Sequence, residues 1–378
     1  EHHHGTTTTT TTSSVYFSYF PPYSYSRHLR LVAQCATANA ASAGAVVVSS
    51  LGQSLQGREI ECITTGTGPL TCWIIHRQHP GETMAEHFAE GLLTRLLGLP
   101  DKCVDGYTNK SNNNKTDGEE AYALDEQVQK LTQLYTFYIV PCMCPDGGVL
   151  GHLRTNAAGA NLNREWATVK DDYEAPTLER SPEVYHVLQR MDETGVDCFV
   201  DVHGDEELPF NFIAGAEMVP QWSPRLQALH GAFTAAFSRA NSDVQPHVGY
   251  PPCETEEQAL KYMNVATNQV VNRFDCLGVT LEMPFKDCLS NPDPEFGWTP
   301  ARSRRLGSSL LDPLEYIHPY LRSTDSNWEH LPLEDAYISP TDDYQSKDEF
   351  APGDGEFSML KKRFFSDVME IHKKNPMQ

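Results

Sequence analysis

The sequence predicts an α/β fold, with a mixed, mostly parallel β-sheet flanked by helices. Segments typical of strands alternate with segments typical of helices through the middle of the chain, which favours this arrangement. Several predicted strands, such as 71–75, are continuous apolar runs, as expected for strands covered on both faces. The length of 378 residues is sufficient for one large domain with extensions.

Apolar periodicity and capping residues place the elements along the chain. Ser181 starts a helix well because proline and an acidic residue follow it in the first turn. Pro313 and Pro319 must kink or break the last long helix, and residues 145–148 are typical of a turn. The predicted helices are 27–43, 82–96, 124–133, 181–194, 224–240 and one from 300, and the predicted strands are 59–64, 71–75, 135–140, 196–202, 210–214 and 277–281.

The chain is acidic, and its charge excludes some classes of partner. It has 29 Lys and Arg against 51 Asp and Glu, a net charge of −22, which argues against nucleic acid and anionic membrane surfaces. No apolar run is long enough to span a membrane. The first residues lack the basic region and apolar core of a signal peptide, and the ten cysteines show no paired spacing. We therefore expect a cytoplasmic protein with reduced thiols.

Composition divides the chain into four parts. Residues 1–14, rich in threonine, are predicted to be a disordered tail, and 15–51 an N-terminal remnant with a strand and a helix. Residues 52–321 carry the alternating elements and are predicted to be the main domain. Residues 322–378 form an acidic C-terminal extension.

A candidate metal site begins at His79-Pro80-Gly81-Glu82, where a buried strand runs into a helix. Ligands in open α/β sheets bind at this edge, and an imidazole with a nearby carboxylate is a common zinc-binding pair. The motif alone is weak, because two other His-x-x-Glu matches begin at His87 and His203. His203 itself follows another buried strand and is the expected third ligand of one zinc ion.

Other polar residues at the same edge fit hydrolytic chemistry. Glu282 ends a buried strand and is a candidate general base, since a carboxylate there can accept a proton from water. Arg154 is a cation that could stabilise an oxyanion, and Asn163-Arg164 could hold a terminal carboxylate. A site that anchors a free carboxylate beside the metal cuts only the last residue, which indicates an exopeptidase.

These motifs, in this order, resemble those of the zinc carboxypeptidases, and specifically the cytosolic branch of that family. The resemblance covers roughly 52–321. It implies a peptide or protein C-terminal tail as substrate, with glutamate a possible terminal residue. The motifs are His79-Pro80-Gly81-Glu82, Gly151-His152-Leu153-Arg154, Asn161-Leu162-Asn163-Arg164, Asp201-Val202-His203-Gly204 and Thr280-Leu281-Glu282.

The resemblance also implies a role for each site residue. His79, Glu82 and His203 would bind zinc, Glu282 would be the base and Arg154 would bind the scissile carbonyl. The terminal carboxylate would be bound by Asn163 and Arg164.

The sequence departs from the family pattern at three places. Asn161 stands where the family usually has an aspartate that orients the first zinc histidine. The mobile tyrosine that covers the substrate is assigned to Tyr262, with Tyr250 as the alternative. The N-terminal β-sandwich of the cytosolic branch is largely absent, because too few residues precede Gly52 to build it.

Two other functions remain open at this point. One is a zinc amidohydrolase of the aspartoacylase type, which would act on a single acylated amino acid. The other is a non-catalytic binding protein on the same fold, motivated by Asn161 and the missing sandwich. A glutamate pocket would also need a cation, for which Arg273, Lys261 and Lys286 are candidates.

Overall fold

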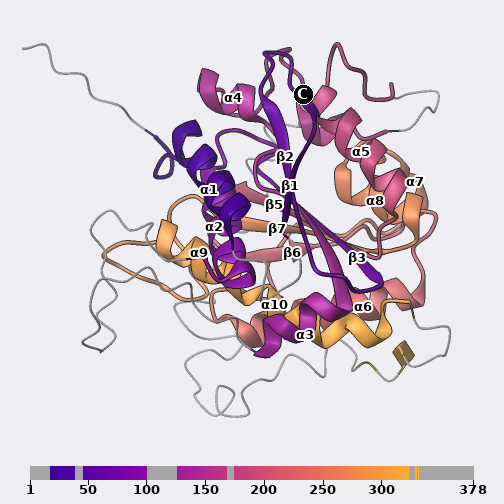
Figure 1. The fold of residues 1–378 in the computed structure, drawn as a ribbon. Coiled ribbons are helices and arrows are strands. Elements are labelled where there is room, and N and C mark those ends of the chain that lie inside the picture. The colour runs from indigo at the N-terminus through magenta and orange to yellow at the C-terminus, as the bar shows by residue number, and fades with distance from the viewer. Residues whose placement is uncertain are drawn as a thin grey trace, which may run out of the picture.

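The fold is a seven-stranded mixed sheet with helices on both faces (Figure 1). A computed structural model describes residues 18–38, 46–99, 126–167, 174–322, 328–329 and 331. The predicted fold class is confirmed. The strands are β1 (Val47–Gln53), β2 (Glu59–Thr65), β3 (Leu70–His76), β4 (Tyr135–Val140), β5 (Cys198–Asp205), β6 (Phe212–Ala214) and β7 (Leu277–Pro284).

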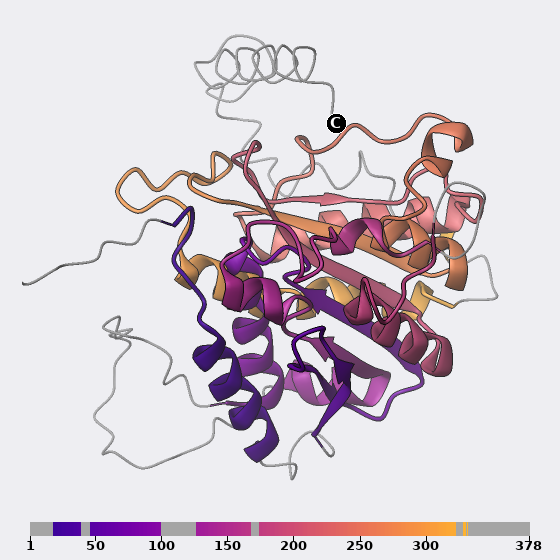
Figure 2. The same ribbon diagram turned by 90° about the horizontal axis from the view of Figure 1, so that it is seen from above.

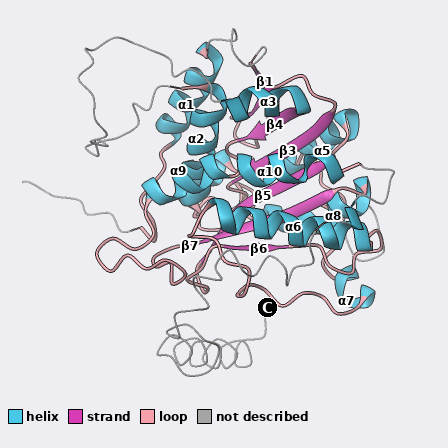
Figure 3. Cartoon of the chain, turned by 90° about the horizontal axis from the view of Figure 1, so that it is seen from below, coloured by secondary structure: helices cyan, strands magenta, loops and turns pink. Residues whose placement is uncertain are grey.

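Helices form a layer on each side of this sheet (Figure 3). The α-helices are α1 (Tyr25–Thr37), α2 (Thr83–Leu97), α3 (Glu126–Leu134), α4 (Pro145–Leu150), α5 (Pro182–Thr194), α6 (Pro224–Ala240), α7 (Glu256–Leu260), α8 (Ala266–Phe274), α9 (Pro300–Ser309) and α10 (Leu311–Ile317). Two 3₁₀ turns, η1 (Leu162–Arg164) and η2 (His318–Tyr320), complete the described elements.

The strand order is β1-β2-β4-β3-β5-β7-β6. The four central strands β4, β3, β5 and β7 run parallel, whereas β1, β2 and β6 pair antiparallel at the two sides. The carboxyl ends of the parallel strands therefore meet along one edge of the sheet, which is where such sheets bind ligands.

The central strands are buried on both faces, as their continuous apolar runs predict. On β3, Cys72 and Ile74 pack into a core cluster that includes residues of α2, α6, α9 and α10. Trp73 and Ile75 face the other way, into a cluster with α5 and α8. Alternating side chains of one strand thus contribute to two separate cores.

Helices α2 and α9 cross at unusually close range because glycines lie at the crossing. A Cβ atom on Gly307 would lie 2.1 Å from the Phe88 carbonyl oxygen, and one on Gly91 would lie 2.0 Å from the Arg304 carbonyl oxygen. The absence of side chains at these two positions lets the backbones touch.

The structure differs from the sequence prediction at several elements, and strand β1 and helices α7 and α8 are among those that the sequence analysis does not predict. Residues 145–150 form helix α4 instead of a turn, since Pro145 suits a first helical turn and Gly151 adopts the left-handed conformation (φ 74°) that ends it. Helix α1 ends at Thr37, and residues 39–45 lie outside the described part. The last long helix, in contrast, divides at Leu310, three residues before Pro313, as the predicted break near this proline requires.

Several predicted features lie outside the described residues. These are the tail at 1–14, the polar loop around 109–118 and nearly all of the extension at 322–378. The predicted division into four parts stays a prediction. Figure 2 shows α1 beside α2, and residues 18–24 lead into α1 without forming a strand. Among the described helices, none has the length and apolar character needed to cross a membrane.

Candidate active site

The three predicted metal ligands meet at the carboxyl edge of the sheet. His79 and Glu82 lie in the loop between β3 and α2, and His203 lies near the end of the adjacent strand β5. The Glu82 carboxylate lies between the two imidazoles, 2.6 Å from His79 Nδ1 and 2.8 Å from His203 Nδ1. One ligand atom of each residue lies within 4.8 Å of the other two, and all three residues are buried.

Each imidazole is held from behind by a second group. His79 Nε2 donates to Asn161 Oδ1 at 2.9 Å, and His203 Nε2 lies 2.9 Å from Asp201 Oδ2. Both rings therefore present Nδ1 towards Glu82, which is the orientation that a shared metal requires. Asn161 is itself oriented, because its Oδ1 also accepts from the Asn163 backbone N–H. The donor set of two imidazoles and one carboxylate fits zinc with an open position.

The electrostatics of this cluster also suit a cation. Burial opposes a charged His203, but Asp201 and Glu82 outweigh it and raise the pKa of His203 well above its usual value. Burial likewise works against the Glu82 carboxylate, yet the two imidazoles lower its pKa below the ordinary range. Three acidic side chains, those of Glu82, Asp201 and Glu282, are buried here together.

Glu282 faces His203 across neighbouring strands. The two residues are direct register partners in the parallel pair β5–β7, so their side chains project from the same face. Burial and the nearby acids raise the pKa of Glu282 well above its usual value, although His203 opposes this. Its Oε2 is buried and has no hydrogen-bond partner among the described residues. A buried carboxylate oxygen without a partner is costly in a purely structural role.

The structure brings Tyr250, not Tyr262, into contact with Glu282. The Tyr250 hydroxyl lies within hydrogen-bonding distance of both Glu282 Oε1, at 3.2 Å, and Asp205 Oδ2. Tyr262 follows α7, and its side chain is about half exposed (49%). The alternative tyrosine of the sequence analysis therefore occupies the place beside the base, and the substrate-binding role of Tyr262 stays a prediction.

The predicted carbonyl-binding residue lies beside the metal loop. The Leu153 carbonyl oxygen accepts a 2.8 Å hydrogen bond from Gly81 N–H, so the segment that carries Arg154 is joined to the loop between His79 and Glu82. Arg154 is exposed to solvent. Burial and the neighbouring His203 lower the pKa of His79. The positive charge of Arg154 lowers this pKa further, as expected for a cation near the ring.

The predicted carboxylate-binding pair is carried by η1. The Asn163 amide accepts from Ala266 N–H at 2.9 Å, and its nitrogen lies 3.4 Å from His203 Nε2. Arg164 donates to the Asn163 carbonyl oxygen at 2.7 Å. The loop thus holds Asn163 at the side of His203, with Arg164 next to it in the chain.

Comparison with known proteins identifies the family to which this chain belongs. The model of the zinc carboxypeptidases, peptidase family M14, matches residues 31–289. The chain belongs to this family. The predicted resemblance and the predicted class of enzyme, a zinc metallocarboxypeptidase, are both confirmed.

Solved carboxypeptidases share the fold. A metallo-carboxypeptidase from Pseudomonas aeruginosa is 40% identical, with a TM-score of 0.67 over 80% of this chain and 71% of that one. A metallo-carboxypeptidase from Burkholderia cenocepacia is also 40% identical, with a TM-score of 0.66 and the same coverage.

Among curated proteins, an uncharacterized protein of Zymomonas mobilis is 42% identical over 78% of this chain and 68% of its own length. Cytosolic carboxypeptidase 6 of Caenorhabditis elegans is 25% identical over 51% of this chain, which matches only 40% of that relative.

Sequence reasoning missed one residue of this zinc carboxypeptidase site. Gln78 donates to Asp201 Oδ2 at 2.7 Å and accepts from the Trp166 indole at 2.8 Å, so it holds the acid that faces His203. Its position directly before His79 was the available signal. His76 and Arg77, in contrast, do not line the metal site: His76 bonds the Val140 carbonyl, and Arg77 bonds Pro80 and Glu86.

Proposed function

We propose that this chain removes the last residue from peptides or protein tails, with one zinc ion held by His79, Glu82 and His203. The observation that carries the proposal is the Glu82 carboxylate between two imidazole Nδ1 atoms, with Glu282 as the register partner of His203. The family match and the 40% identical metallo-carboxypeptidases support it over the amidohydrolase and the non-catalytic alternatives.

Glu282 moves the proton in this proposal. Zinc bound to the three ligands would supply Lewis acidity that makes water easier to deprotonate. Glu282 accepts a proton from the attacking water and later gives it to the leaving amine. Its raised pKa suits a group that must hold a proton between these two steps. Tyr250 orients Glu282 through its contact with Oε1, and this leaves Oε2 available to the attacking water.

The cations of the site bind the substrate. Arg154, beside the metal loop, stabilises the negative charge that develops on the scissile carbonyl oxygen. Asn163 and Arg164 hold the terminal carboxylate, and a guanidinium is suited to that role because it can form two parallel hydrogen bonds. Tyr262, about half exposed after α7, is the remaining candidate for a contact with the substrate side chain.

We place this activity in the cytoplasm. All nine described cysteines are free thiols, eight of them buried, as expected for a reducing compartment. Distant relatives are named cytosolic carboxypeptidases. The high negative charge of the chain also makes nucleic acid and anionic membranes poor partners.

The terminal residue is either glutamate or a basic residue. Glutamate follows from the cytosolic branch, but Arg273, one candidate cation for its pocket, already forms two 2.7 Å hydrogen bonds with Asp192. A basic residue is favoured by Glu206, an acidic residue three positions after His203. The Pseudomonas aeruginosa enzyme was solved with (2-guanidinoethylmercapto)succinic acid, a ligand that carries a guanidino group.

A Glu282→Gln variant tests the mechanism. Glutamine keeps the shape but cannot accept the proton, so we expect kcat to fall by about 10²–10⁴-fold while zinc stays bound. Activity is measured as release of the C-terminal amino acid, and zinc by elemental analysis. The proposal is wrong if wild-type protein holds no near-stoichiometric zinc, if a chelator leaves peptide cleavage unchanged, or if the variant stays fully active.

A peptide panel tests the substrate. Peptides that differ only in a terminal Glu, Lys, Arg or Leu are compared by kcat/KM. Faster cleavage of Lys and Arg ends would reject the glutamate hypothesis, and faster cleavage of Glu ends would reject the basic one. A single acylated amino acid, included as a further substrate, would be preferred only by an amidohydrolase.

A further inference from the structure

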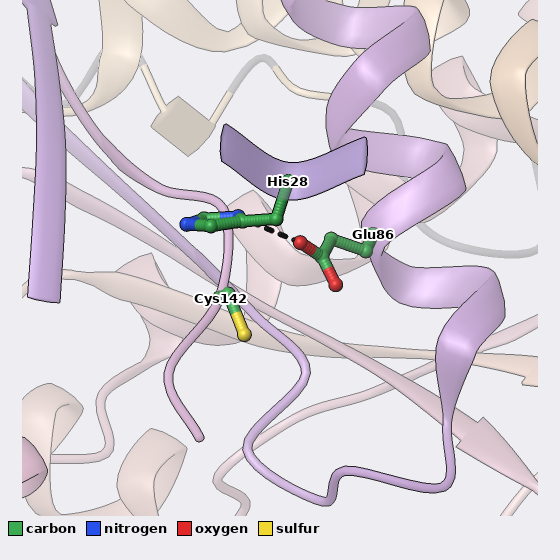
Figure 4. Close-up of side chains that lie close together, drawn as sticks. All are labelled: His28, Glu86 and Cys142. Atoms are coloured by element: carbon green, nitrogen blue, oxygen red, sulfur yellow. Dashed lines mark hydrogen bonds and ion pairs between the residues drawn. The ribbon is translucent and has the colours of Figure 1, made fainter. Parts of the chain in front are cut away.

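A second cluster of metal-binding residue types lies beneath the metal loop. It consists of His28 on α1, Glu86 on α2 and Cys142 after β4 (Figure 4). All three are buried. His28 Nδ1 lies 2.7 Å from Glu86 Oε1, whereas the Cys142 sulfur points away from this hydrogen bond in Figure 4.

Charge balance shows that this cluster is not a second metal site. His28 Nε2 also faces Glu61 Oε2 at 3.0 Å, so both ring nitrogens donate to carboxylates. Arg77 forms an ion pair with the other oxygen of Glu86. Two cations, His28 and Arg77, thus already neutralise two anions, Glu61 and Glu86. A divalent ion bound at Glu86 would be repelled by the positive charge of the Arg77 guanidinium, which already pairs with this carboxylate.

The same network reaches the metal loop through Arg77. Its Nε donates to the Pro80 carbonyl oxygen at 2.9 Å, inside the His79–Glu82 loop, and its Nη1 donates to the Tyr23 carbonyl oxygen at 3.1 Å. The Arg77 backbone is left-handed (φ 56°), which is uncommon for a residue other than glycine. A strained backbone of this kind persists only where surrounding contacts hold it.

We propose that His28 is a positioning residue for the metal-binding loop. The hydrogen bond from His28 orients the Glu86 carboxylate, which in turn orients the Arg77 guanidinium through their ion pair. Arg77 then holds the Pro80 carbonyl oxygen, which lies in the loop between the ligands His79 and Glu82. His28 lies before the residues matched by the family model, which begin at 31. The N-terminal segment therefore supports the site from outside the matched domain. This inference rests on the proposed zinc site.

The test compares His28→Gln with Arg27→Ala. Glutamine is neutral and can donate to only one of the two carboxylates at a time. Arg27 lies next to His28 on α1 and pairs with Glu90 on α2 at 2.8 Å, so its loss removes an ion pair between the same helices but none of the hydrogen bonds of Arg77. The readouts are the zinc dissociation constant, measured against a competing chelator, and kcat and KM at saturating zinc.

We expect His28→Gln to weaken zinc binding about tenfold and to lower kcat with little change in KM, at the lower end of effects seen for residues behind metal ligands. Arg27→Ala should lower only the melting temperature. The inference is overturned if His28→Gln binds zinc within twofold of wild type, or if Arg27→Ala weakens zinc equally.

A second variant covers the case in which His28→Gln does not fold. Arg77→Lys keeps the positive charge beside Glu86 but cannot reach Pro80 and Tyr23 at the same time. The same tenfold loss of zinc affinity is expected, and an unchanged affinity overturns the inference. A wild-type protein that binds no zinc would instead overturn the proposed function itself.

Discussion

At the scale of single residues, we expect Asn161 to influence how strongly His79 binds metal. It accepts from His79 Nε2 at 2.9 Å but carries no charge. A carboxylate in this place makes the imidazole a stronger donor to the metal. We expect Asn161→Asp to tighten zinc binding by about tenfold, as measured by competition with a chelator. Asn161→Ala, the control, should weaken it; equal affinities in all three proteins would contradict this role.

Tyr250 and Tyr262 make a second comparison at this scale. Removing the Tyr250 hydroxyl takes a hydrogen bond from Glu282, and we expect Tyr250→Phe to lower kcat/KM by roughly tenfold, since a bond to a charged group contributes about 1.5–3 kcal/mol. Tyr262→Phe should change it less than twofold if this tyrosine does not touch the substrate. Steady-state kinetics of both variants on one peptide compares the two tyrosines. A larger loss of kcat/KM in Tyr262→Phe than in Tyr250→Phe would assign the catalytic role to Tyr262.

Residue types at strand ends made it predictable that His79, Glu82 and His203 meet, because apolar runs such as 71–75 define where each strand stops. Tyr250 was harder to assign. It lies in a loop whose path over β7 depends on tertiary contacts, including the edge-on packing of its ring against Phe212, and a periodic pattern does not encode these. Gln78 shows the same limit, since its partners Asp201 and Trp166 are distant in sequence.

At the scale of elements, the contact between α2 and α9 supports α2, whose N-cap residue is Glu82. Gly307→Ala would place a methyl group 2.1 Å from the Phe88 carbonyl oxygen and 3.1 Å from Leu92 N, so the helices must separate. We expect the free energy of unfolding to fall by about 1–3 kcal/mol, measured by urea denaturation. Ser308→Ala on the same helix, which loses only a bond to the Arg305 carbonyl, should stay within about 0.5 kcal/mol of wild type. Equal stability of both variants would contradict close packing here.

Helix α4 shows why one element was predicted wrongly. Pro145-Asp146-Gly147-Gly148 has the composition of a turn, and the local sequence favours that reading. Tertiary contacts change the outcome: the buried Asp146 carboxylate accepts from the Ser54 hydroxyl at 2.7 Å and from the Gln56 N–H at 2.9 Å. Ser54 and Gln56 precede Asp146 by 92 and 90 residues, so a local sequence pattern could not reveal these contacts.

At the scale of the whole molecule, the His28 network links stability to pH. Burial opposes the charged ring, but hydrogen bonds to Glu61 and Glu86 outweigh it and raise the pKa of His28 to about 9 from 6.5. The folded state therefore holds this proton more tightly than the unfolded state. The stabilisation is fully present below pH 6.5 and is lost as the pH rises through about 9.

Comparing wild type with His28→Gln isolates this contribution. We expect the difference in their free energies of unfolding to shrink by up to roughly 3 kcal/mol between pH 6.5 and pH values above 9. Urea denaturation at both pH values measures it, and taking the difference between the two proteins cancels the titration of other groups. A difference that is constant or grows with pH would show that His28 is not charged in the folded protein.

The pairing of His203 with Glu282 in the β5–β7 ladder has a consequence for divergence within the family. Adjacent strands are separated by about 4.8 Å, and this spacing is fixed by backbone hydrogen bonds whatever the side chains are. The surrounding loops can therefore change in length or sequence, and so alter substrate choice, while the distance between His203 and Glu282 stays constant. A slip of one residue between these two strands would turn one of the pair to the opposite face, so the ladder tolerates no such shift.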